Sequence, residues 1–190
     1  AVPKRAYERG LHQIGSLGLR GVEHAFDAET PAGRVRMANI SVLIPGARPE
    51  RLIVGGHYDT KRFGPVRFVG ANDGGSSAAF LIELARALKD RRGPLTIELV
   101  LFDGEEAVVD WAGTDHTYGS REYVANARRD GSLAQIRAMV LVDMIGDRNL
   151  RIRREQFSTR WLTDLFWASA GRLGHSDVFT AESMAVEDDH

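Results

Sequence analysis

Acidic and imidazole side chains follow directly after three short apolar segments of this chain. The segments, each with the side chains that come after it, are 51–55 with His57 and Asp59, 96–102 with Glu105 and Glu106, and 138–142 with Asp143. If these segments are neighbouring parallel strands, their carboxyl ends share one crevice, the usual ligand site of an open α/β sheet. Asp73 joins them at the start of the helix that follows. Carboxylates crowded in one crevice repel one another, and a divalent cation removes that repulsion.

The sequence has no cysteine, so any metal must be held by His, Asp and Glu. Oxygen and imidazole ligands suit zinc, although they also accept manganese or cobalt. The absence of cysteine also excludes disulfides and a thiol nucleophile.

Each candidate has a structural alternative. Asp73 could be the N-cap of the next helix, which is a common role for Asp. His57 could be a core histidine that is bonded to a backbone carbonyl. Asp59 lies two residues after His57, so in an extended segment both side chains point the same way, and Asp59 can orient the imidazole from behind. Alternatively, Asp59 begins a turn.

The adjacent pair Glu105 and Glu106 favours catalysis over a solvated loop. Two carboxylates directly after an apolar strand are costly unless they are used. Because neighbouring side chains diverge, one can bind a metal while the other faces the substrate as a base. Asp143 could be a ligand, a catalytic group or a cap. The presence of all these acidic and imidazole residues together, more than any one of them, indicates metal catalysis.

Other features carry less information. Trp111 lies five residues beyond Glu106 and could form the wall of a substrate pocket or pack locally. The glycine-rich stretch 70–75 lacks the Lys and the spacing of a phosphate loop, and is expected to let the backbone approach the metal site. We expect Ser76 and Ser77 to pack within the first turn of a helix, and the basic run 148–154 to be a solvated edge strand.

Apolar periodicity predicts the elements that position these residues. The predicted helices are 3–17, with Tyr7, Leu11 and Ile14 on one face, then 76–89, 118–128, and a helix capped by Ser158 that runs to Leu173 with Trp161, Leu162, Leu165 and Phe166 inward. The predicted strands are 22–30 and 37–44, forming a hairpin, then 51–55, 96–102, 138–142 and 150–153. Strands that alternate with helices indicate an α/β fold, a sheet covered on both faces, in one domain over residues 1–190.

Composition excludes several classes of protein. The 190 residues are 43% hydrophobic and 27% charged, with a net charge of −1, which argues against nucleic acid as a partner. No apolar run approaches the ~20 residues of a membrane helix. The chain begins with Ala1 and shows no signal peptide, so the compartment cannot be read from it.

These residues resemble the glutaminyl cyclase and zinc-aminopeptidase family of metallo-exopeptidases. The matching segments are Gly56–Lys61, Phe68–Asp73, Phe102–Ala107, Leu141–Gly146 and Asp188–His190. Trp111 and the segments 115–121, 30–33 and 39–40 look like the glutaminyl cyclase branch. The pair Asn72-Asp73 is closer to the aminopeptidases, because cyclases more often have Thr before the Asp.

By matching position, the resemblance implies that Asp73 and Glu106 bind zinc and that Glu105 is the general acid/base. It also implies a pocket wall at Trp111. The family fold is a mixed, mostly parallel sheet flanked by helices, which agrees with the elements predicted above.

The resemblance leaves the number of metal ions open. In the aminopeptidases, His57 and Asp143 hold a second metal ion, with Asp73 bridging the two. In the animal cyclases one zinc suffices, and Asp143 and Asp188 form a catalytic hydrogen-bond network with Glu105.

We therefore expect a zinc-dependent glutaminyl-peptide cyclotransferase that acts on peptide or protein N-termini. The alternatives are a zinc aminopeptidase and a non-catalytic metal-binding domain. The family suggests an extracytoplasmic location. The chain reads as truncated at both ends, and a further zinc-ligand His is expected after His190, which itself matches a non-ligand position. On that interpretation the chain alone should bind zinc weakly.

Overall fold

The computed structural model describes residues 4–64 and 66–190, apart from the side chains of residues 4–7. In chain order the elements are α1 (Lys4–Ser16), β1 (Gly21–Thr30), β2 (Gly33–Ile44), β3 (Arg48–His57), α2 (Gly75–Leu88), β4 (Leu95–Phe102), α3 (Tyr118–Arg129), the 3₁₀ helix η1 (Ser132–Gln135), β5 (Ile136–Leu141), β6 (Ile152–Glu155), α4 (Arg160–Arg172) and β7 (Phe179–Met184). The predicted elements are confirmed in type, with ends that shift by a few residues. Pro3 and the side chain of Tyr7 lie outside the described part of the chain.

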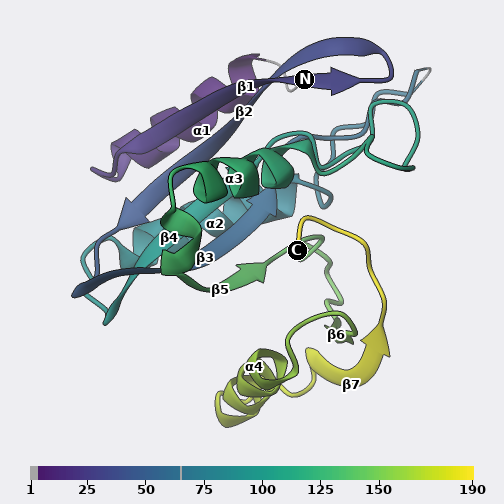
Figure 1. Cartoon of the computed structure of the whole chain (residues 1–190). Coiled ribbons are helices and arrows are strands. Elements are labelled where there is room, and N and C mark those ends of the chain that lie inside the picture. Colours follow the sequence, from purple (N-terminus) through teal and green to yellow (C-terminus); the bar gives the residue numbers. More distant parts are fainter. Residues whose placement is uncertain (1–3, 65) are drawn as a thin grey trace.

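The central sheet has five strands in the order β1-β2-β4-β3-β5 (Figure 1). The β1–β2 hairpin is antiparallel, as predicted, and β2 is antiparallel to β4. β3 is parallel to both of its neighbours, β4 and β5. A separate sheet pairs β6 with β7 in parallel. Among the described residues, the fold is therefore a mixed, mostly parallel α/β arrangement.

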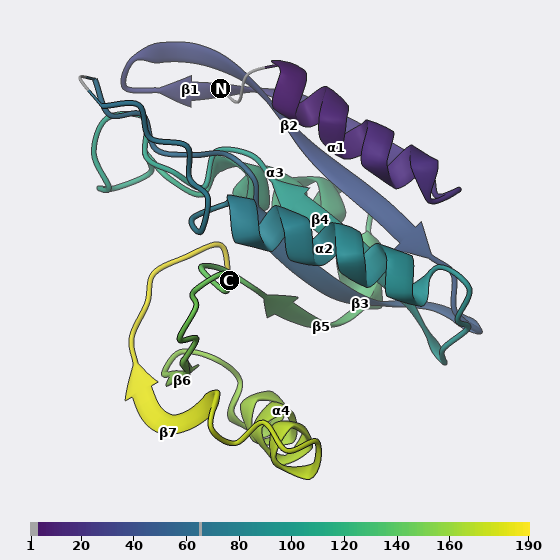
Figure 2. The ribbon, with the colours of Figure 1, turned by 180° about the vertical axis from the view of Figure 1, so that it is seen from behind.

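Helices cover both faces of the central sheet. α1 and α2 lie on one face, and α3 lies on the other (Figures 1 and 2). Successive side chains of β4 point to opposite faces of the sheet. Leu99 and Leu101 belong to the hydrophobic cluster under α2, whereas Val100 and Phe102 belong to the one under α3. This double burial explains why β4 is an almost continuous apolar run.

α4 is the element whose environment differs most from the prediction. The helix is present, but Trp161, Leu165 and Phe166 are 61%, 51% and 41% exposed instead of facing inward. Ala170 is the buried residue of the helix, and Leu162, as predicted, and Trp167 are half-buried. The Trp167 Nε1 donates to the carbonyl of Thr180 at 2.6 Å. α4 lies beside the small β6–β7 sheet, away from the central sheet (Figure 1).

The start of α4 also differs from the prediction, whereas the strand before it is confirmed. Ser158 does not cap this helix: Thr159 is at the N-cap, and the Ser158 amide donates to Glu155 Oε2 at 2.6 Å. The predicted edge strand 150–153 is β6, which pairs with β7. β7 escapes sequence reasoning because most of its side chains are exposed, so it has no buried apolar signal.

None of the helices in the described residues is both long and apolar enough to cross a lipid bilayer.

Candidate active site

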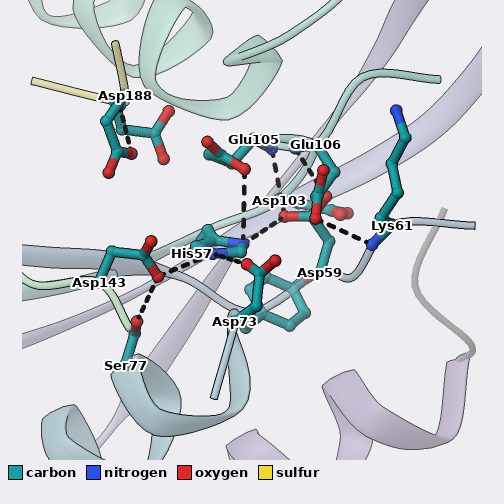
Figure 3. A network of polar contacts seen from close by, with 12 residues as sticks. His57, Asp59, Lys61, Asp73, Ser77, Asp103, Glu105, Glu106, Asp143 and Asp188 are labelled. Carbon is teal, nitrogen blue, oxygen red and sulfur yellow. Dashed lines mark hydrogen bonds and ion pairs between the residues drawn. The ribbon is translucent and has the colours of Figure 1, made fainter. Parts of the chain in front are cut away.

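The parallel half of the central sheet gathers the predicted site residues. β3 lies between β4 and β5, and the pairing continues past the strand ends through Tyr58 N to Phe102 O at 3.0 Å and Val142 N to Gly55 O at 2.9 Å. The side chains that follow the three strands therefore converge at one edge of the sheet, as predicted. Figure 3 shows the resulting group: His57, Asp59, Asp73, Glu105, Glu106, Asp143 and Asp188.

His57, at the end of β3, is the centre of this group and is only 2% exposed. Its Nε2 lies 3.1 Å from Asp143 Oδ1 and 3.1 Å from Asp73 Oδ1. Burial alone would lower the pKa of His57, but the carboxylates of Asp143, Asp59 and Asp73 raise it far above its usual value. The metal-free site thus favours a positive charge at this position.

Asp59 lies on the opposite side of the imidazole, with Oδ1 3.4 Å from His57 Nδ1. The geometry is too poor for a hydrogen bond, and Nδ1 has no hydrogen-bond partner among the described residues. Asp59 also has a role that the sequence did not predict: Oδ1 accepts from the Glu105 amide at 3.1 Å and Oδ2 from the Glu106 amide at 3.2 Å. It therefore fixes the backbone that carries both glutamates.

Asp73 faces His57 and does not cap α2, whose N-cap residue is Gly74. Gly74 has φ 80°, and a Cβ there would collide with the carbonyl oxygen of Asp59. Glycine is needed for both reasons, and the backbone approaches the site closely, as predicted. The contact with His57, at 3.1 Å, lowers the pKa of Asp73, and the neighbouring Glu106 carboxyl adds to this effect.

Glu105 and Glu106 diverge, as expected for adjacent side chains. Glu106 Oε1 accepts from the Lys61 amide at 3.1 Å, and its pKa is raised by burial and by the charge of Asp73. Glu105 is buried, with Oε2 3.9 Å from His57 Nδ1. Burial raises the pKa of Glu105 to about 9, with help from the charges of Asp188 and Asp189.

Asp188 approaches the group from the end of the chain (Figure 3). Burial raises its pKa, and the charge of Asp143 adds to the rise. Because the charge of Asp188 also raises the pKa of Glu105, the Asp188 carboxyl lies within electrostatic reach of both Asp143 and Glu105.

The donor set fits a divalent cation. One ligand atom from each of His57, Asp73 and Asp143 lies within 4.8 Å of the others, and Glu106 adjoins Asp73. Carboxylate oxygens and an imidazole nitrogen are ligands that zinc accepts. Burial is the main cause of the raised pKa values of Glu105, Glu106 and Asp188, and neighbouring carboxylates raise them further, although His57 lowers them. A bound cation would also lower these pKa values.

Trp111 does not belong to the carboxylate cluster. It stacks face to face on His116, with ring centroids 4.3 Å apart and an interplanar angle of 10°. The loop that carries both rings is organised by Asp115, whose carboxylate accepts hydrogen bonds from the amides of residues 108, 109 and 110 and from the Tyr118 hydroxyl.

Sequence reasoning missed the contacts of four polar residues beside the cluster. Ser77 is fully buried, and its Oγ lies 3.4 Å from Asp143 Oδ1, so it reaches beyond its own helical turn. Ser76 likewise accepts from the Ile145 amide at 3.0 Å. Ser120 and Asp189 are both buried behind Asp188, and the Ser120 Oγ donates to Asp189 Oδ1 at 2.6 Å. The helix N-termini adjoining the strand ends were the only available signal for these serines.

The sequence is also similar to known proteins. Glutaminyl-peptide cyclotransferase of the snake Boiga irregularis is 36% identical over 152 residues, which are 67% of this chain and 41% of that protein. The crystal structure of an Acidobacteriales bacterium glutaminyl cyclase has 41% sequence identity and a TM-score of 0.87, covering 96% of this chain and 63% of that one. For the Porphyromonas gingivalis glutaminyl cyclase the identity is 28% and the TM-score 0.88, with 100% and 70% covered.

The chain thus spans well under half the length of the curated relative from Boiga irregularis. A model of the family described as "Peptidase family M28" matches residues 39–190, the part that runs from the middle of β2 through the whole strand-end cluster. Because this match covers most of the chain, and because the chain is similar to solved glutaminyl cyclases, the chain belongs to peptidase family M28.

Proposed function

We propose that this chain carries the catalytic centre of a zinc-dependent glutaminyl-peptide cyclotransferase, which converts an N-terminal glutamine into pyroglutamate and releases ammonia. The observation that carries the proposal is the buried carboxyl of Glu105, which lies beside a group of metal-ligand side chains and has a pKa of about 9. The names of the similar proteins support the substrate, because both the curated relative and the solved structures are glutaminyl cyclases.

Asp73 and Glu106 are the residues that would bind zinc in the cyclase. When bound, zinc acts as a Lewis acid that polarises the side-chain amide carbonyl of the substrate glutamine. The interaction between Asp73 and Glu106 supports this pairing. The site of His57, Asp73 and Asp143 would be occupied as well if two ions are bound.

Glu105 would transfer the proton. The α-amine of the substrate attacks the δ-carbon, and Glu105 accepts the proton that the amine loses. Glu105 then donates a proton to the departing nitrogen as the bond from the δ-carbon to the amide nitrogen breaks and ammonia leaves. A carboxyl with a raised pKa suits both steps, and a nearby cation would bring that pKa down towards neutrality.

Asp143 and Asp188 would complete a hydrogen-bond network with Glu105. The charge of Asp188 raises the pKa of Glu105, and the charge of Asp143 raises the pKa of Asp188, which supports this assignment. The ring of Trp111, held by its stacking on His116, would form one wall of the substrate pocket.

An aminopeptidase is the second candidate, and the metal-ligand group favours it. With ions at both His57–Asp143 and Glu106, and with Asp73 between them, Glu105 would activate a water molecule against the first peptide bond. The family description as a peptidase and the Asn72-Asp73 pair also support this alternative. A non-catalytic domain is the third candidate, and a buried Glu105 argues against it, because such a domain has no use for the base.

Product analysis distinguishes these functions. Full-length protein loaded with zinc is incubated with a Gln-initiated peptide and, separately, with Leu- and Ala-initiated peptides of otherwise equal sequence. The proposal expects ammonia and a blocked N-terminus from the first peptide only. Free amino acids released from the other two would establish the aminopeptidase. No product from any peptide, with zinc bound, would support the non-catalytic alternative.

The metal content of the active protein tests the number of ions. About one zinc per chain supports the cyclase site, and two equivalents support the aminopeptidase site.

A further inference from the structure

The segment that carries Asp188 is anchored on both sides of that residue. Glu187 Oε1 lies 3.9 Å from His116 Nε2, Asp189 accepts from Ser120, and His190 Nε2 lies 3.3 Å from Glu155 Oε2. The anchors belong to three separate places: the loop before α3, the first turn of α3 and the end of β6. A lone carboxylate that faces other carboxylates would otherwise be driven towards solvent.

Asp189 is the buried anchor, with 8% of its surface exposed. Its Oδ1 accepts from Ser120 Oγ at 2.6 Å, and its own amide donates to Asp188 Oδ1 at 2.6 Å. One residue therefore connects α3 directly to the carboxylate of Asp188. The second oxygen, Oδ2, is buried and has no hydrogen-bond partner among the described residues. Burial raises the pKa of Asp189 to about 7, which shows how costly this placement is.

Ser120 provides a fixed point for this connection. It is buried in the first turn of α3, where its Oγ also lies 3.2 Å from the Thr117 carbonyl. The neighbouring residue, Gly119, accepts from Asn39 Nδ2 at 2.8 Å, and a Cβ at Gly119 would collide with Asn39 and Asp103. The start of α3 is therefore held closely against β2 and the end of β4, the strand that leads to Glu105.

We propose that Ser120 and Asp189 form a positioning pair that holds Asp188 against Glu105 and Asp143. The pair does not touch the reacting atoms. It acts through Asp188, so the inference rests on the proposed function, in which Asp188 works with Glu105. The pair also explains why a costly buried carboxylate lies directly behind the site.

Kinetics of three serine variants test the positioning role in the full-length, zinc-loaded protein. Ser120→Ala removes the donor, Ser120→Thr keeps a hydroxyl, and Ser41→Ala removes a comparably buried hydroxyl that bonds His24 at 2.8 Å, in β2. With rates expressed per bound zinc, Ser120→Ala should lower kcat about tenfold with KM within about twofold of the wild type, because misplaced catalytic groups affect turnover more than binding. Ser120→Thr should recover most of the loss, and Ser41→Ala should match the wild type.

Hydrogen exchange tests the same geometry without relying on catalysis. The Ser120–Asp189 bond ties the end of the chain to α3, so residues 185–190 should exchange about tenfold faster in Ser120→Ala, with the central sheet unchanged. Unchanged exchange of this segment would overturn the positioning pair, whatever the activity. An unchanged kcat in an active protein would overturn it too. A wild-type protein that binds zinc but does not cyclise Gln peptides would instead overturn the proposed function, and the exchange result would still decide the geometry.

Discussion

At the scale of single residues, the site gives similar carboxylates different properties. Asp59 is held by two backbone amides, Asp73 is ionised beside His57, and Glu105 is buried with its pKa at about 9. These environments, more than the side-chain types, separate the candidate ligands from the candidate base. The adjacent sequence positions of Glu105 and Glu106 produce the same separation, because neighbouring side chains point apart.

The sequence predicted most of this group of residues and missed its supports. Strand ends can be recognised from apolar runs, so the positions of His57, Glu105 and Asp143 followed directly. The contact between Ser120 and Asp189 joins residues 69 apart in the chain. Nothing in the local pattern of either residue encodes that contact, and only the folded structure reveals it.

Replacing Asp59 with Asn should disturb both glutamates. Asn has one acceptor oxygen where Asp59 uses two, so one buried amide would face an NH₂ group and lose its partner. A lost buried hydrogen bond costs about 1–3 kcal/mol of unfolding free energy. We expect Asp59→Asn to lose that amount in urea denaturation, together with most of the turnover. The exposed Asp27, which pairs with Arg36 at 3.2 Å, provides the control: Asp27→Asn should change stability by less than about 0.5 kcal/mol. If both variants lost the same unfolding free energy, Asp59 would not be the residue that fixes the backbone of Glu105 and Glu106.

Replacing His116 with Ala should affect substrate binding. The stacked pair of Trp111 and His116 is expected to contribute about 0.5–1.5 kcal/mol, so losing it frees the indole ring and should raise KM about two- to tenfold. The kcat should change little, because the contact of His116 with the mostly exposed Glu187, at 3.9 Å, is a weak one. Steady-state kinetics on a Gln-initiated peptide measures both quantities. His175→Ala, at an exposed position after α4, is the matched control. If the two variants have the same KM, Trp111 does not form the wall of the pocket.

At the scale of elements, the three parallel strands β4, β3 and β5 position the site, and they were predictable. Each is a short apolar run, and parallel order follows from the helices between them. The environment of α4 was not predictable. Its apolar periodicity identified the helix correctly, but periodicity cannot say whether another element covers the apolar side. In the described structure Trp161 remains largely exposed.

A buried ion pair connects these parallel strands on the α3 side. Arg51 of β3 lies 2.7 Å from Glu98 of β4, and the Tyr123 hydroxyl of α3 donates to the same Glu98 oxygen at 2.9 Å. Glu98→Gln would leave the guanidinium of Arg51 without its counter-charge. We expect a loss of about 3 kcal/mol or more in unfolding free energy.

The exposed pair Arg34 and Glu29 provides the comparison for that measurement. Both of its side chains are mostly in solvent, so Glu29→Gln should cost less than about 1 kcal/mol. A Glu98→Gln protein as stable as Glu29→Gln would show that the Arg51–Glu98 pair does not hold β3 to β4.

At the scale of the whole molecule, the site costs stability that a metal ion would restore. Burial raises the pKa values of Glu105, Glu106 and Asp188, so the folded metal-free protein holds protons that the unfolded chain releases at lower pH. The raised pKa of His57 acts in the same direction. The stability from these groups is complete below their unfolded pKa values and is lost as pH rises through the folded ones. The lowered pKa of Asp73 has the opposite effect, but only below about pH 4.

The melting temperature of the zinc-free protein should therefore fall as pH rises from about 6 to 9. Zinc should raise the melting temperature, because a ligand that binds only the folded state stabilises it, and should flatten the decline with pH. Differential scanning fluorimetry across this range, with chelator or with zinc, measures both effects. A melting temperature of the zinc-free protein that increases towards pH 9 would contradict the raised pKa values.

The central claim is that the adjacent glutamates have separate roles, with Glu106 binding zinc and Glu105 moving the proton. Measuring zinc content and turnover together, in Glu105→Gln and Glu106→Gln, tests it most directly, because both changes replace a carboxyl group with an amide of nearly equal volume. We predict that Glu105→Gln keeps its zinc and loses turnover on Gln-initiated peptides, whereas Glu106→Gln loses zinc. Zinc lost from Glu105→Gln, with zinc and turnover retained in Glu106→Gln, would contradict it.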